Sequence, residues 1–186
     1  MTVERGPRIK GTDIVTLRKL FADRPPSDLA RFLQSLAPED REGYEGALHF
    51  HWLPADRVTR IFVAAAPLFF PSSPRALQQL GQLLATRSFS SVYKLILSVP
   101  SLPFVVRRAS MVWSWYHDLG EASIEDTSDR ALTLVVRGTP RLPEAMRELI
   151  AGHLLALAEA THTPNAKVTL FSDDPNAWRW RIRWSD

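Results

Sequence analysis

The 186-residue sequence contains no cysteine, which excludes disulfides, thiolate metal sites and a cysteine nucleophile. Its longest apolar run, residues 61–71, is too short to span a bilayer and is interrupted by Pro67. The first ten residues lack the apolar segment of a secretory signal. We therefore expect a cytoplasmic protein without membrane insertion.

Catalytic signatures are also missing. The sequence has no glycine-rich phosphate loop, no Gly-x-Ser-x-Gly element and no His-Glu-x-x-His motif, and its scattered carboxylates suggest no acid–base pair. The 23 basic and 20 acidic residues nearly balance. The net charge of +3 therefore indicates solubility and is too small to indicate nucleic-acid binding. These absences favour a protein that is not an enzyme and does not bind nucleic acid, although an enzyme stays open.

The sequence does contain enough apolar residues for a core. A hydrophobic fraction of 45%, with six Trp and nine Phe, excludes a disordered chain and predicts one domain over residues 1–186. We expect a flexible tail over 1–10, a helical part over 11–119 and a ββαββ part over 120–186.

Prolines and caps divide the helical part. Helices are predicted to start near residues 11, 26, 54 and 74, with a possible break at 86–90. Residues 38–46 read as an acidic, turn-rich connector, and 47–53 as a short extended segment.

The stretch 101–138 organises the chain. Ser101 and Pro103 are typical of a helix start, and residues 104–116 are apolar round most of a helical circumference. That pattern predicts a helix buried on several sides, which ends at Gly120.

Two hairpins and a helix follow. Strands are predicted over 121–126, 131–137, 167–172 and 178–184, with a helix starting at Pro143 whose apolar residues share one face. Because each strand pair is linked by a short turn, we expect one four-stranded antiparallel sheet with the long helix packed on it. The predicted fold class is α+β, with a helical N-terminal half before a ββαββ unit.

Four segments carry a resemblance to known proteins: Ile9-Lys10-Gly11-Thr12, residues 104–109, residues 113–116 with Gly120, and residues 180–184. With the order of elements, they resemble the superfamily of 4-vinyl reductase domains, haem–nitric-oxide-binding domains and TRAPP transport-particle subunits. The likeness is greater to a domain of unknown function known mainly from myxobacteria. It covers nearly the whole chain and implies a small or hydrophobic ligand held between helices and sheet, a sensory role and a dimer.

The chain also departs from that superfamily. The zinc-bearing members use cysteines near the C-terminal strands, and the haem members use a helical histidine with a Tyr-x-Ser-x-Arg element. This sequence has neither the cysteines nor that element. We therefore expect no metal and no cofactor.

Aromatic and histidine side chains are the candidates for lining a ligand cavity, although the aromatic ones equally suit an ordinary core. The candidates are Phe62, Phe69, Tyr93, Trp113, Trp115, Tyr116, His117 and His153. His117 could act as an axial ligand or base, or could cap a helix C-terminus; His153 could be a satisfied core residue. His49 and His51 could form a metal clip, but a half-exposed strand explains them better.

The last strand alternates tryptophans with Arg179, Arg181 and Arg183. Strict alternation separates the two kinds on opposite faces, which argues against stacking nucleic-acid bases. We expect the tryptophans under the long helix and the arginines paired with acidic groups such as Glu121 and Glu125. Alternatively, the arginines face an acidic ligand or a subunit interface.

Together these observations predict a non-catalytic module that binds an apolar small molecule or senses one, acting through a partner or as a homodimer. A ligand-free scaffold subunit is the first alternative. An enzyme acting on an apolar or tetrapyrrole-like substrate is the second.

Overall fold

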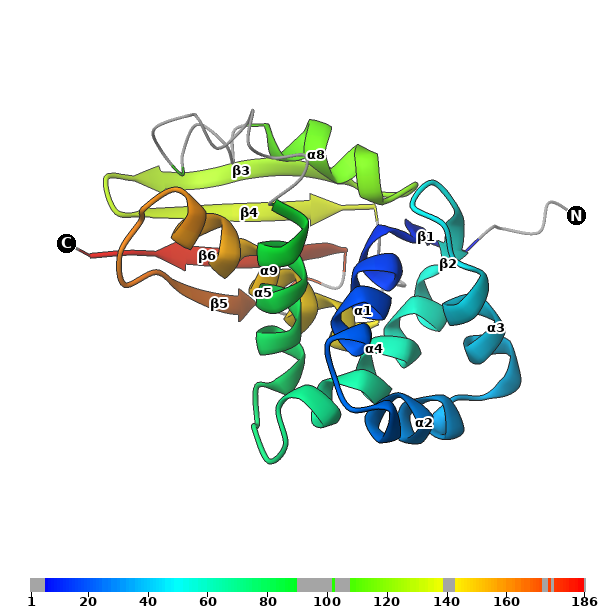
Figure 1. The fold of residues 1–186 in the computed structure, drawn as a ribbon. Helices are drawn as coiled ribbons and strands as arrows, with labels where there is room; N and C mark the ends of the chain where they lie inside the picture. Colours follow the sequence, from blue (N-terminus) through cyan, green and yellow to red (C-terminus); the bar gives the residue numbers. More distant parts are fainter. Residues whose placement is uncertain are drawn as a thin grey trace, which may run out of the picture.

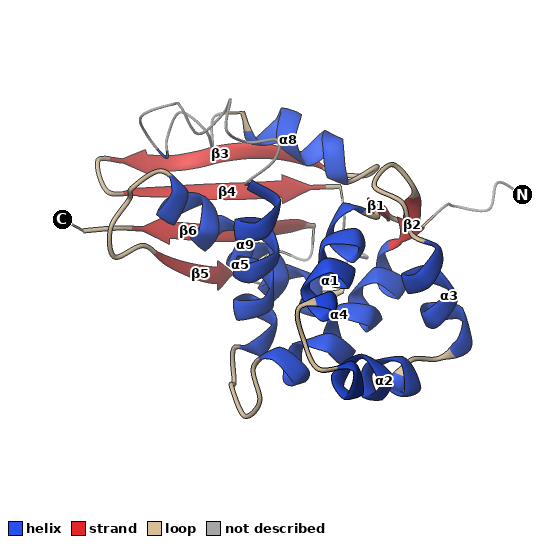
Figure 2. Ribbon diagram, in the orientation of Figure 1, coloured by secondary structure: helices blue, strands red, loops and turns tan. Residues whose placement is uncertain are grey.

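The structure, a computed structural model, describes residues 6–89, 102, 108–138, 143–171, 174 and 176–185. Its C-terminal part is a four-stranded sheet with one face covered by helices, and its N-terminal part is helical (Figures 1 and 2). The predicted α+β fold class is confirmed. No described helix is long and apolar enough to cross a membrane.

Five helices build the described N-terminal part, and prolines set several of their starts. They are α1 (Thr12–Ala22), α2 (Pro26–Ser35), α3 (Pro38–Gly46), α4 (Ala55–Phe69) and α5 (Ala76–Phe89). Pro26 and Pro38 occupy the first turn, where the missing N–H costs no hydrogen bond. The predicted break at 86–90 is wrong up to Phe89, because α5 continues to that residue.

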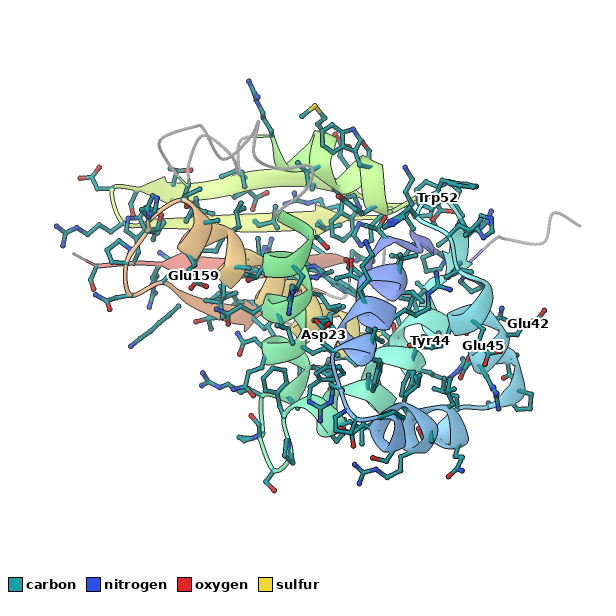
Figure 3. The ribbon with its side chains drawn as sticks, in the orientation of Figure 1. Asp23, Glu42, Tyr44, Glu45, Trp52 and Glu159 are labelled. Carbon is teal, nitrogen blue, oxygen red and sulfur yellow. The ribbon has the colours of Figure 1, made fainter. Side chains whose placement is uncertain are left out.

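An aromatic cluster holds the first three helices together. The Phe21 ring stacks on Phe32 with centroids 4.6 Å apart, and Tyr44 meets Phe32 edge-on at 4.9 Å. Figure 3 shows Tyr44 on the inner side of α3, facing the neighbouring helices. Residues 38–46 form the helix α3, so the turn-rich connector predicted for them is wrong.

The sheet contains β3 (Glu121–Ser128), β4 (Ala131–Arg137), β5 (Lys167–Phe171) and β6 (Ala177–Arg183). Its order is β3-β4-β6-β5 and every pair is antiparallel, as the hairpins predict. The helix α9 (Glu144–Ala160) packs on this sheet, and α5 crosses α9 (Figure 1). Trp178 and Trp180 are buried, and the Trp180 Nε1 donates to the Arg147 carbonyl of α9 at 3.0 Å.

A second, two-stranded sheet joins the start of the chain to its middle. The strand β1 (Arg8–Lys10) pairs antiparallel with β2 (Trp52–Pro54), and Ile9 also bridges to His117. The flexible tail predicted over 1–10 is therefore wrong for residues 8–10. The extended segment predicted over 47–53 is strand only from Trp52 onward.

The central helix is less buried than its composition predicts. Of it, the structure describes α8 (Ala109–Tyr116), which lies beside β3 and β1 (Figure 1). Trp113 is buried, but Met111 is 41% exposed and Trp115 is 38% exposed. The prediction of a helix buried on several sides is therefore wrong for α8, because Met111 and Trp115 are exposed while Trp113 is buried. Gly120 ends this region with a φ of 87°, which favours glycine.

Candidate functional site

A cavity of about 160 Å³ lies where the helical part meets the inner face of the sheet. Side chains from β1, α1, α4, α5, α8, β3, β4 and α9 surround it. Its apolar walls are formed by Ile9, Phe62, Ala85, Val112, Trp113, Ala122, Leu134, Met146, Leu149, Ile150, Leu154 and Leu157. Its polar groups come from Asp13, Ser88, Tyr116, His117 and His153.

His117 is held flat against the wall of this cavity. Its ring stacks on the Trp113 indole with centroids 3.6 Å apart and planes 8° apart. Its Nδ1 lies 3.3 Å from the Trp113 carbonyl, which can only accept a hydrogen bond. Nδ1 must therefore carry the proton, and Nε2 is left with a lone pair. Burial lowers the pKa of His117 to about 3, so the ring is neutral at neutral pH.

His153 projects from α9 into the same site, close to the first turn of α1. Its Nε2 lies 3.4 Å from the Asp13 carboxylate Oδ2, but without hydrogen-bond geometry, and this buried atom has no hydrogen-bond partner. Nearby, the hydroxyls of Ser88 and Thr16 are 3.1 Å apart. The cavity thus has largely apolar walls and a polar end where α1, α5 and α9 approach one another.

Most of the candidates named from the sequence lie on this cavity. Phe62, Trp113, Tyr116, His117 and His153 line it. Of the remaining candidates, Phe69 and Trp115 lie elsewhere.

Phe69 packs edge-on against Phe21 with centroids 4.9 Å apart, away from the cavity. Trp115 points partly into solvent. Tyr93 lies outside the described residues. His49 is exposed in a loop, and no group of three potential metal ligands gathers among the described side chains.

The arginines of β6 lie on the face of the sheet opposite α9. Arg179 approaches Asp174 at 3.9 Å, whereas Glu125 pairs with Arg137 of β4 and not with β6. The predicted separation of tryptophans and arginines on two faces is thus observed. The predicted pairing of Glu125 with the β6 arginines is wrong, because β4 lies between the two strands.

Sequence reasoning missed Asp13 and Ser88. Asp13 looked like an ordinary acidic residue in a first helical turn, where the helix dipole favours negative charge. Ser88 stood in a predicted helix break. Only the packing of α1 on α5, and of α5 on α9, brings these two polar side chains to the cavity that His153 lines.

No family model matches this chain, and no curated protein is similar to it in sequence. Solved structures are similar in fold. The Fe(II) unliganded H-NOX protein from K. algicida has a TM-score of 0.69 and 12% identity, covering 95% of this chain and 97% of that one. An H-NOX protein from S. oneidensis in the Fe(II)NO state has a TM-score of 0.67 and 16% identity, covering 95% and 99%.

The Fe(II) states of these neighbours raise the question of whether this cavity fits haem. His117 Nε2 could serve as an axial ligand. However, a volume near 160 Å³ suits a benzene-sized molecule, and ligand pockets for larger molecules measure about 300–1,000 Å³. Among the described lining residues no Lys or Arg is present to neutralise the haem carboxylates. The described residues therefore do not fit haem. The chain thus has the fold of H-NOX proteins, and its described cavity suits a molecule smaller than haem.

Proposed function

We propose that this chain is a cytoplasmic, non-catalytic module that holds one small apolar molecule between its helical part and its sheet. The observation that carries the proposal is the cavity itself, which is walled mostly by aliphatic and aromatic side chains. Ligand sites are typically concave and apolar, with a few placed polar groups. A kinship with 4-vinyl reductase, TRAPP and myxobacterial domains is part of the same proposal.

The size of the cavity limits the ligand. A cavity of about 150 Å³ lined by apolar side chains takes up benzene, so this one suits a single ring or a short branched chain. The position at the meeting of two structural parts also supports a sensory role, because a bound molecule would touch both α8 and α9. Binding could then shift how these helices sit on the sheet.

Ligand-observed NMR with toluene tests the proposal, together with native mass spectrometry of the freshly purified protein. We expect toluene to bind with a one-to-one ratio and Ala85→Phe to abolish binding, because the new ring fills the cavity from α5. The same ring should cost little stability, since it enters empty space.

Ala158→Phe is the matched control: Ala158 is fully buried on α9 but lies off the cavity. Overpacking there should destabilise the protein by about 1–3 kcal/mol. Absence of toluene binding to the native protein would contradict the proposal, as would unchanged binding to Ala85→Phe.

A protein-binding role is the second candidate, and the exposed side of α8 favours it. Met111, Trp115 and, just beyond the helix, Leu119 are spaced four residues apart and are each about two-fifths exposed. Aromatic residues and methionine are enriched in interfaces. We propose a homodimer through this stripe, which Trp115→Glu should convert to a monomer in sedimentation velocity. Equal sedimentation of both proteins would argue against it.

A further inference from the structure

We infer that the ligand carries a hydrogen-bond donor, best a protonated amine, at one end of a ring-sized apolar body, and that carboxylates are rejected. This inference rests on the proposed function and names the chemical class of ligand. It is drawn from three polar side chains that line the cavity, Asp13, His117 and His153, of which Asp13 and His153 lie 3.4 Å apart.

Two of the lining residues offer hydrogen-bond acceptors. Asp13 contributes the single formal charge among the described lining residues, a carboxylate. His117 donates through Nδ1 to the Trp113 carbonyl, which leaves its Nε2 as an acceptor. A neutral ring with one nitrogen already donating can only accept at the other. Both groups can therefore accept a hydrogen bond from a donor on the ligand.

His153 supplies a polar atom that no described side chain satisfies. Its Nε2 is buried and has no hydrogen-bond partner, although the Asp13 carboxylate is 3.4 Å away. A buried polar atom without a partner is costly, and such atoms in folded proteins usually meet a ligand, water or ion. A ligand head group that lies beside this pair and bridges Asp13 and His153 would satisfy both.

The charge of Asp13 and His153 decides whether the site favours a cationic or an anionic ligand. With His153 neutral, the Asp13–His153 pair carries one negative charge, and with His153 protonated the pair is neutral. His117 stays uncharged near neutral pH. In neither state does the site offer net positive charge to an anion. A carboxylate would lose its hydration and gain no cation, whereas an ammonium would pair with Asp13.

Four single-ring probes differ only in the head group: toluene, benzyl alcohol, benzylamine and benzoate. We expect dissociation constants measured by NMR at neutral pH to follow the order benzylamine, benzyl alcohol, toluene, benzoate. A charge-assisted hydrogen bond should make benzylamine bind roughly tenfold or more tighter than toluene. Asp13→Asn removes the charge at constant shape. It should remove most of the benzylamine advantage over toluene, when both are measured on the same variant.

Glu159→Gln is the matched control, since it removes a negative charge on α9 that lies away from the cavity, where Glu159 accepts from Gln82. It should leave the benzylamine advantage intact. If toluene binds but benzoate equals or exceeds benzylamine, or if Asp13→Asn keeps the amine preference, the inference is overturned and the proposed function stands. If no probe binds, the proposed function itself fails.

Discussion

At the scale of single residues, His117 shows how packing decides the chemistry of a side chain. Its position at a helix end suggested an interaction with the helix dipole, which favours a protonated ring. In the fold, the ring lies flat on Trp113 and inside the cavity wall, so burial outweighs the dipole and keeps it neutral. An uncharged acceptor is suited to a largely apolar cavity.

This lowered pKa predicts a pH dependence of stability. The pKa of His117 falls from 6.5 to about 3 in the folded protein, so between these values the unfolded chain binds a proton that the folded chain does not. The contribution of the uncharged His117 ring to the free energy of unfolding is therefore fully present above pH 6.5. It is lost as the pH falls toward 3. Relative to His117→Phe, which keeps a stacked ring but cannot titrate, the native protein should lose up to about 1.4 kcal/mol per pH unit.

Urea unfolding across this pH range measures the difference, and His49→Gln controls for the loss of an exposed imidazole. Asp13 and His153 face His117 in the cavity, so they are kept unchanged in every variant. Equal pH profiles for the native protein and His117→Phe, or an NMR titration of His117 centred near 6.5, would show that burial does not control this ring.

At the scale of elements, the crossing of α5 over α9 depends on two glycines. A Cβ on Gly152 would collide with the Gln78 carbonyl, and one on Gly81 would collide with the Leu149 carbonyl. Backbone atoms cannot move aside as a side-chain end can, so the helices would have to separate. This crossing also positions Ser88 and His153 at the cavity, which makes it part of the site.

Gly152→Ala should therefore destabilise the protein by about 1–3 kcal/mol, although alanine is the better helix former. Denaturant midpoints measure the effect. Gly46→Ala is the matched control, because open space surrounds a Cβ at that position in α3; it should be neutral or stabilising by up to about 1 kcal/mol. A stabilised Gly152→Ala variant would mean that α5 and α9 are not in close contact.

Elements with clear periodicity were predictable, and those held by distant partners were not. The alternation of β6 and the one-sided stripe of α9 define their faces locally. The helix α3 has few apolar residues, and its burial depends on Asp40, which accepts hydrogen bonds from Arg60 of α4 at 2.6 and 2.8 Å. Likewise β1 forms only because β2 and His117 lie beside it.

At the scale of the whole molecule, the order of helices and strands along the sequence predicted most of the fold. Short turns between strand pairs predicted an antiparallel sheet, and the helices before it predicted a separate layer. The same aromatic residues suit a core or a cavity wall, so the sequence could not separate the two. Phe62 and Trp113 border an open space, whereas Phe69 is part of a filled aromatic cluster.

The fold shared with H-NOX proteins also does not determine what the site holds. Only about one residue in seven is identical, at 12–16%. The described cavity has a volume of about 160 Å³ and a carboxylate, Asp13, in its lining, whereas haem needs a larger volume and cations beside its own carboxylates. A similar scaffold can thus serve a different ligand when side chains at its centre change.

Diffraction from a crystal pressurised with xenon would show directly whether the apolar cavity is open to a small molecule, because xenon occupies dry apolar cavities of this size. The account predicts a xenon atom enclosed by Phe62, Trp113, Leu134 and Leu154, between the helical part and the sheet. Side chains filling that space, with no xenon among them, would contradict it.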